Sequence, residues 1–273
     1  MENSAHKIVQ LNPNYHASMS NKLLNSCYSL TTIEKRIILL TLSRLNSSKE
    51  ISSTEWYSMD INEYARLCNV SRSDAYDDLR EATSKLYFRS ITEIEGKKRT
   101  DFRWIQAIEV DVDSQSVKLM WSTNILPYIS ELKSDFTRLF MLDVLKIDGI
   151  YASRLYDLLY QEKFRGLVGS KEIDLETLYN SWNLPDSYRE YKEFRRGVLK
   201  PAMVELTKKG LVKLDIKELV IGKKNGRKAI SIIIPYQIIS EVLVEAENAK
   251  DIVIAQLKKE VTQLKKYGVV LEE

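Results

Sequence analysis

The sequence predicts an α+β fold of two similar modules in tandem, each with three helices followed by a β-hairpin. Helix caps stand before apolar residues at helical spacing, short polar turns separate β-rich runs, and the same order of elements occurs twice. The chain has 273 residues, enough for about two domains.

The first module opens with a capped helix. Thr31 and Glu34 have the spacing of a capping box, and apolar residues continue at helical spacing beyond them. A short strand is expected near 56–59. Asp60 then caps a second helix, and Ser71 caps a longer third helix.

The third helix is followed by β-rich sequence. Two strand-like runs, 90–94 and 102–112, are joined by the polar turn 95–99, which is typical of an exposed hairpin tip. A further run, 117–121, is expected to complete the same sheet.

The second module repeats this order. A helix is expected over 150–161, Asp174 caps the next one, and a basic helix follows. Strands are predicted over 211–215 and 229–234, the latter closing on a proline, with a hairpin tip at 222–228. Helix-turn-helix followed by a hairpin is the order of a winged helix, so the prediction is tandem winged-helix domains, each with a β-hairpin wing.

The domain boundary is expected near Pro127, which interrupts the pattern. After Ser240 the chain predicts one long helix, either packed on its own domain or forming a short coiled coil. The expected segments are a flexible N-terminal arm (1–20), a first winged-helix domain (21–125), a second winged-helix domain (126–240) and a C-terminal helical tail (241–273).

Composition argues against most cofactor and metal enzymes, and we expect no cofactor and no metal. Cys27 and Cys68 cannot form a structural zinc site alone, and the two histidines, His6 and His16, lie in the polar N-terminal stretch. The sequence contains no Walker motif. It has no apolar stretch long enough for a membrane span and no signal peptide, so a cytoplasmic protein is expected.

Positive charge is concentrated in one segment. Residues 188–228 hold thirteen Lys and Arg against five Asp and Glu, which leaves 28 basic and 33 acidic residues elsewhere. A charge run is often only a solvated surface. Clustered positive charge is also what a polyanion requires, so a nucleic-acid-binding face is the functional interpretation.

The basic helix divides into two faces. Arg195 flanks its basic stripe; with Arg196 it is the best candidate to contact bases, whereas Lys192 and Lys200 suit phosphates. The stripe is expected to contain Arg189, Lys192, Arg196 and Lys200. Apolar residues that can anchor the opposite face are Phe194, Val198 and Ala202. Pro201 predicts a kink near Gly197, with a true helix break as the alternative.

The two modules differ in charge. The predicted third helix of the first module has three basic and four acidic residues, so this module should bind DNA more weakly or serve partly in protein contacts. Its candidate DNA contacts are Arg72, Lys97, Lys98 and Arg99. The candidates on the second wing, for backbone or minor-groove contact, are Lys223, Lys224, Arg227 and Lys228.

Several segments carry a family resemblance. The stretch Tyr191–Ala202, followed by Glu205-Leu206, resembles the signature of plasmid replication initiator (Rep) proteins. Asn21–Leu24, Glu34–Arg36 and Ser153–Tyr156 also match the pattern of that family.

The resemblance covers about residues 21 to 236 and implies a theta-type initiator with two winged-helix domains. Such a protein binds repeated origin sequences (iterons) in double-stranded DNA, opens the strands with a host initiator and loads the host helicase. Monomers of the family initiate, while dimers joined through the first domain repress their own gene or pair origins. We therefore expect a DNA-binding protein without catalysis of its own.

Three other functions remain as alternatives. A transcriptional repressor with tandem winged helices differs from an initiator only through the resemblance. A rolling-circle nickase would need closely spaced histidines, and His6 and His16 are ten residues apart. A pure interaction protein would not bind DNA even at low salt.

Overall fold

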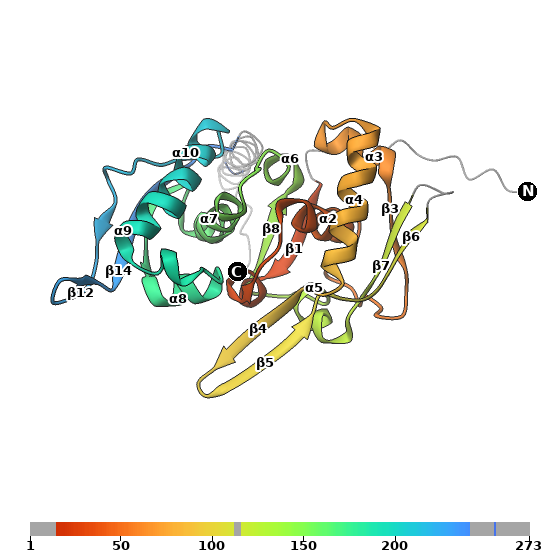
Figure 1. The fold of residues 1–273 in the computed structure, drawn as a ribbon, viewed down its shortest axis with the longest axis horizontal. Coiled ribbons are helices and arrows are strands. Elements are labelled where there is room, and N and C mark those ends of the chain that lie inside the picture. The colour runs from red at the N-terminus through yellow and green to blue at the C-terminus, as the bar shows by residue number, and fades with distance from the viewer. Residues whose placement is uncertain (1–14, 112–115, 241–253, 255–273) are drawn as a thin grey trace, which may run out of the picture.

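The computed structural model describes residues 15–111 and 116–240 together with Ile254. Two winged-helix modules lie side by side (Figure 1). In the first half the helices are α1 (Asn21–Asn25), α2 (Thr32–Leu42), α3 (Ile61–Cys68), α4 (Arg72–Leu86), a 3-10 turn (Thr123–Ile125) and α5 (Leu126–Ile129). Its strands are β1 (His16–Ser20), β2 (Cys27–Tyr28), β3 (Tyr57–Asp60), β4 (Ser90–Glu95), β5 (Lys98–Arg103), β6 (Ile105–Asp111) and β7 (Ser116–Trp121).

The second half follows the same order. Its helices are α6 (Met141–Val144), α7 (Ile150–Tyr160), a 3-10 turn (Gln161–Arg165), α8 (Leu175–Ser181), a 3-10 turn (Asp186–Tyr188), α9 (Tyr191–Phe194), a π-helical turn (Arg195–Leu199) and α10 (Lys200–Lys208). Its strands are β8 (Phe136–Phe140), β9 (Val168–Asp174), β10 (Val212–Lys213), β11 (Val220–Ile221), β12 (Lys224–Asn225), β13 (Lys228–Ala229) and β14 (Ser231–Ile238).

The caps predicted from the sequence begin the helices of the first module. Thr31 and Glu34 form a complete capping box at α2. Side chains of Asp60 and Ser71 each accept a hydrogen bond from the backbone three residues on, at 2.9 and 3.1 Å. These bonds satisfy amides that have no partner within the helix, which is why α3 and α4 start where they do.

The prediction of a single sheet in the first module is wrong. The run 102–112 divides at Trp104, so that β5 pairs with β4 while β6 pairs with β7. One sheet has the order β2-β4-β5 and the other β3-β7-β6. The Trp104 side chain is 1% exposed and packs edge-on against Tyr28, with ring centroids 5.1 Å apart. Trp104 is thus buried at the point where the chain passes from one sheet to the other. The β4–β5 hairpin belongs to a different sheet from the one that contains β3.

The second module has one principal sheet. β14 is its central strand, with β9 on one side and both β10 and β11 on the other. The strand was expected to close on Pro235, but it continues to Ile238. Pro235 lies between Ile233, which pairs with β11, and Gln237, which pairs with β10. A proline has no N–H to donate, so it is tolerated at a position of β14 that pairs with neither β10 nor β11.

Several strands were not predicted, among them β1, β8 and β9. β1 pairs antiparallel with β8, with Ala17 opposite Leu139, so the prediction of a flexible arm is wrong for residues 16–20. β9 escaped prediction because its mostly polar residues lack apolar alternation. Residues 1–14 and the predicted tail helix lie outside the described residues, apart from Ile254. The domain boundary stays a prediction.

A single hydrophobic cluster extends through both modules. It contains Leu39 of α2, Leu79 of α4, Leu155 of α7 and Leu206 of α10, each at most 1% exposed. The α+β tandem winged-helix prediction is confirmed. Among the described residues, no helix combines the length and apolarity needed to cross a membrane.

Candidate nucleic-acid interface

The third helix of the second module has one buried face and one basic face. Its anchors Phe194, Val198 and Ala202 are at most 3% exposed. Four basic side chains of the same helical segment are exposed: Lys192, Arg195, Arg196 and Lys200. The predicted division into faces is therefore confirmed, and the cations are available to a ligand.

Arg189 does not belong to the basic stripe, contrary to the prediction. The helix begins at Tyr191 because Glu190 has an extended backbone, with φ −89° and ψ 131°. Arg189 instead ends the preceding 3-10 turn. Its guanidinium donates to Asn180 Oδ1 at 2.9 Å and to the carbonyl of Leu184 at 3.2 Å. A DNA contact by Arg189 stays a prediction.

Pro201 is accommodated by a change of helix type. The backbone N–H of Lys200 donates to the carbonyl of Arg195, a bond one residue wider than that of an α-helix. α10 then starts with Pro201 in its first turn, where its missing N–H costs little. The alternative of a true break is therefore wrong, since the helix widens into a π-helical turn and continues as α10. A kink near Gly197 stays a prediction.

The arginines on this helix have weak protein partners. Arg196 pairs with Glu193 at 2.5 Å, although its side chain remains 77% exposed. Arg195 donates to the carbonyl of Ile216 at 3.3 Å. Exposed pairs of this kind contribute little stability, about 0–1 kcal/mol. Both guanidinium groups can therefore exchange these partners for acceptors on DNA at small cost.

The second wing is short and basic. β12 and β13 pair with Asn225 opposite Lys228, and Gly226 turns the chain with φ 58°. All four wing cations are exposed, and none makes an ion pair with a described residue: Lys223, Lys224, Arg227 and Lys228.

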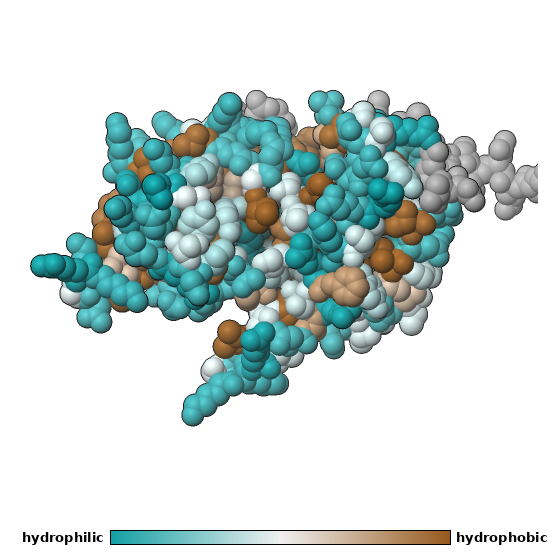
Figure 2. All heavy atoms as spheres, viewed as in Figure 1, coloured by the Kyte–Doolittle hydropathy of each residue, from teal (hydrophilic) through white to brown (hydrophobic). Residues whose placement is uncertain are grey.

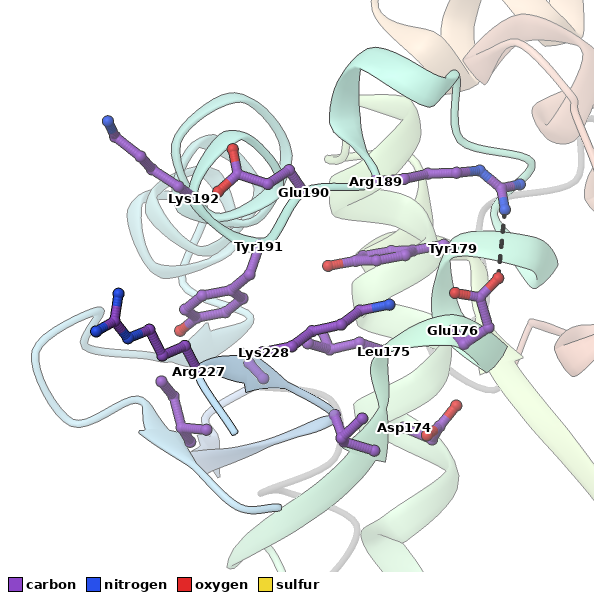
Figure 3. Close-up of a pocket in the computed structure, with 13 residues that line it drawn as sticks. Asp174, Leu175, Glu176, Tyr179, Arg189, Glu190, Tyr191, Lys192, Arg227 and Lys228 are labelled. Carbon is purple, nitrogen blue, oxygen red and sulfur yellow. Dashed lines mark hydrogen bonds and ion pairs between the residues drawn. The ribbon is translucent and has the colours of Figure 1, made fainter. Parts of the chain in front are cut away.

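A cleft of about 400 Å³ lies between the third helix and this wing. In Figure 3 the rings of Tyr179 and Tyr191 face the cleft and the Lys228 side chain extends toward Tyr179. Desolvation raises the pKa of Tyr179 to about 12, and it also raises the pKa of Tyr191. Burial thus keeps both hydroxyls protonated to a higher pH than that of a tyrosine in water.

Sequence reasoning missed these two tyrosines. The Tyr179 hydroxyl has no hydrogen-bond partner among the described residues. Its spacing from Leu175 is that of an ordinary core residue, so no signal distinguished it. Tyr191 could have been found as an aromatic residue at the start of the basic stretch.

The first module presents a sparser basic surface. Arg72, at the first residue of α4, is exposed. Lys97 and Lys98 lie at the tip of the β4–β5 hairpin, whereas Arg99 is held by Asp101 at 3.0 Å. Figure 1 shows this hairpin projecting from the body, and Figure 2 shows hydrophilic residues over the tips of both projecting hairpins.

Comparison with known proteins assigns the family. Residues 16–160 match the family "Initiator Replication protein, WH1", and residues 174–236 match "Initiator Rep protein, WH2". The first match alone covers more than half of the chain. This chain belongs to the replication initiator family.

Individual proteins similar to this chain belong to the same class. An Escherichia coli "Replication initiation protein" is 30% identical over 204 residues, which are 72% of this chain and 63% of that protein. The Escherichia coli "PI protein" is 23% identical over 239 residues, covering 76% of this chain and 78% of that protein. The crystal structure of the Pi initiator protein in complex with iteron DNA has a TM-score of 0.71 at 21% identity, covering 84% of this chain and all of that one. That likeness supports the fold.

The motifs that suggested the family lie in two places in this chain. Tyr191–Ala202 forms the basic third helix. Asn21–Leu24, Glu34–Arg36 and Ser153–Tyr156 belong to α1, α2 and α7, away from the basic cleft. Among the described residues, no group of three potential metal ligands is gathered.

Proposed function

We propose that this initiator binds iterons in double-stranded origin DNA and recruits the host initiator and helicase to open the origin. The observation that carries the proposal is the pairing of an exposed basic helix with an exposed basic wing across one cleft. Family membership supports replication as the process. The resemblance to a Pi initiator solved with iteron DNA supports repeats as the target.

In this proposal the contacts divide by chemistry. Arg195 and Arg196 contact guanine edges in the major groove, because a guanidinium can donate to both O6 and N7. Lys192 and Lys200 bind phosphates beside that groove. The wing lysines and Arg227 bind backbone or minor groove, where their charge suits any sequence.

The first module makes the weaker contact. Arg72, Lys97 and Lys98 lie on exposed surface and can bind phosphate, while Arg99 must first exchange its partner Asp101. Self-association through this module, with monomers initiating and dimers repressing, is part of the proposal. Sedimentation with and without iteron DNA tests it.

Footprinting on candidate origin DNA tests iteron binding. Tandem protected repeats, each about two helical turns long, are expected if both modules contact one repeat. A transformation assay tests initiation: a plasmid with these repeats should replicate only when the protein is supplied. Binding without replication dependence would favour the repressor instead. A covalent protein–DNA adduct formed with Mg²⁺ or Mn²⁺ would favour the nickase.

A further inference from the structure

A buried ion pair joins α2 to α7, the helix that ends the WH1 match and packs against α10 of the basic helix. Lys35 of α2 pairs with Asp157 of α7, and Lys35 Nζ also donates to Ser153 Oγ at 2.6 Å. The Lys35 and Asp157 side chains are 7% and 2% exposed. Burial lowers the pKa of Lys35, and the Asp157 carboxylate opposes that shift. A pair removed from water in this way is stable only in a geometry that keeps both charges matched.

Arg154 makes a second bridge between the modules. Its guanidinium carbon lies 3.9 Å from the centroid of the Tyr28 ring. Its Nη2 donates to the carbonyl of Ser26, the C-cap of α1, at 3.0 Å and to that of Ser181, the last residue of α8, at 2.8 Å. Carbonyls at helix ends lack intrahelical partners and favour a cation, so Arg154 stabilises both helix ends.

A third connection reaches the basic helix itself. Arg36 Nη2 donates to Asp148 Oδ1 at 3.0 Å and to two carbonyls of the same loop. Backbone amides of Asp148 and Gly149 donate to Glu205 of α10 at 2.7 and 3.0 Å. Gly149 permits this approach, since a Cβ there would overlap Glu205 Oε2.

We propose that Lys35, Asp157 and Arg154 are positioning residues that fix the spacing at which the two modules engage one DNA duplex. All three are at most 7% exposed, so they act through the elements that they join and not by touching DNA. Directional charge contacts admit one arrangement of α2 against α7, where apolar packing would admit several. The proposal rests on the proposed function.

Altered spacing of the DNA site tests this directly. Footprinting first locates the segments protected by each module, and five base pairs are then inserted between them to rotate one segment by about half a turn. Because a rigid protein then engages only one segment, the wild type should lose about 10- to 100-fold in affinity. K35M/D157L should bind native DNA more weakly and lose less than about threefold on the inserted DNA.

The double variant is chosen to stay folded, since apolar replacement of a buried ion pair is often neutral or stabilising. Arg154→Lys, which keeps the charge but loses the planar fork, is a second variant with the same expected loss of discrimination. The matched control is E109A/K118A, which removes an exposed 2.7 Å pair within the first module. It should keep the wild-type ratio of affinity for native DNA to affinity for inserted DNA.

Three results would overturn the proposal. One is a K35M/D157L protein that is folded, as judged by its thermal unfolding, and still has the wild-type ratio of affinities for native and inserted DNA. Another is a wild type that is indifferent to the insertion. Absence of any repeat protection by the wild type would reject the proposed function, and this proposal with it.

Discussion

Gly197 lies directly against the ring of Tyr188. A Cβ on residue 197 would come within 2.5 Å of Tyr188 Cε1 and 3.2 Å of Cδ1. Tyr188 belongs to the 3-10 turn that precedes α9, and Gly197 lies in the π-helical turn. The close approach therefore fixes the entry of the chain into the basic helix.

Gly197→Ala should destabilise the protein by about 1 kcal/mol, because the ring must move. Overpacking typically costs about 1–3 kcal/mol, while replacing glycine in a helix gains about 1 kcal/mol. In a Tyr188→Ala background only the gain remains, so the same glycine substitution should then be neutral or stabilising. Urea unfolding of the four proteins measures this coupling. Equal effects of Gly197→Ala in both backgrounds would show that the ring contact is unimportant.

Arg196→Ala should weaken iteron binding by about 1–3 kcal/mol and relax the preference at one base position. The Arg196 side chain is 77% exposed and is paired only with Glu193 among the described residues. Competition binding against iterons substituted at each position locates the lost preference. An equal loss on iteron and random DNA would instead assign Arg196 to the phosphate backbone.

Glu193→Gln is the companion change. It releases Arg196 from an exposed ion pair, so the stability should change by less than about 0.5 kcal/mol. Affinity for iteron DNA should stay the same or rise, because the guanidinium no longer exchanges partners. A clear loss of affinity would mean that Glu193 orients Arg196 for its contact.

Local signals predicted much of this fold. The caps at Thr31, Asp60 and Ser71 depend on residues three positions apart, so sequence alone located them. The two faces of the basic helix followed from helical periodicity in the same way. Each of these features is determined within one or two turns of chain.

Features set by distant contacts escaped prediction. The pairing of β1 with β8 joins segments more than one hundred residues apart, and the division of 102–112 depends on burial of Trp104. Arg189 was assigned to the stripe by periodicity, yet the extended backbone of Glu190 starts the helix after it. The Lys35–Asp157 pair was not predicted, because its two members are far apart in the sequence and meet only where α2 packs against α7.

Asp148→Asn should change how stability depends on pH. A hydrogen bond from Lys209, assisted by Arg36, holds the pKa of Asp148 below its ordinary 3.8. A carboxyl with a depressed folded-state pKa contributes stability that is present above the unfolded pKa and is lost as the pH falls through the folded one. The variant should therefore be less stable than the wild type at pH 6.

The stability difference between the two proteins should shrink as the pH falls below the ordinary pKa of 3.8. Denaturant unfolding at a series of pH values measures it. A difference that stays constant down to pH 2 would mean that the introduced amide disturbs the loop through its shape, and that the charge of Asp148 is irrelevant.

Replacement of Lys223 or Lys224 by alanine should weaken binding to all DNA sequences alike. Each lysine that neutralises one phosphate contributes about 0.9 to the slope of log affinity against log salt, so each change should flatten that slope by about one unit. Both side chains are exposed on a wing whose fold depends on Gly226 and backbone pairing, so stability should be unaffected. Lys118→Ala, on β7 of the other module, is the control and should leave the slope unchanged. A wing variant that keeps the wild-type slope but loses preference at one base would move that lysine from the backbone to the groove.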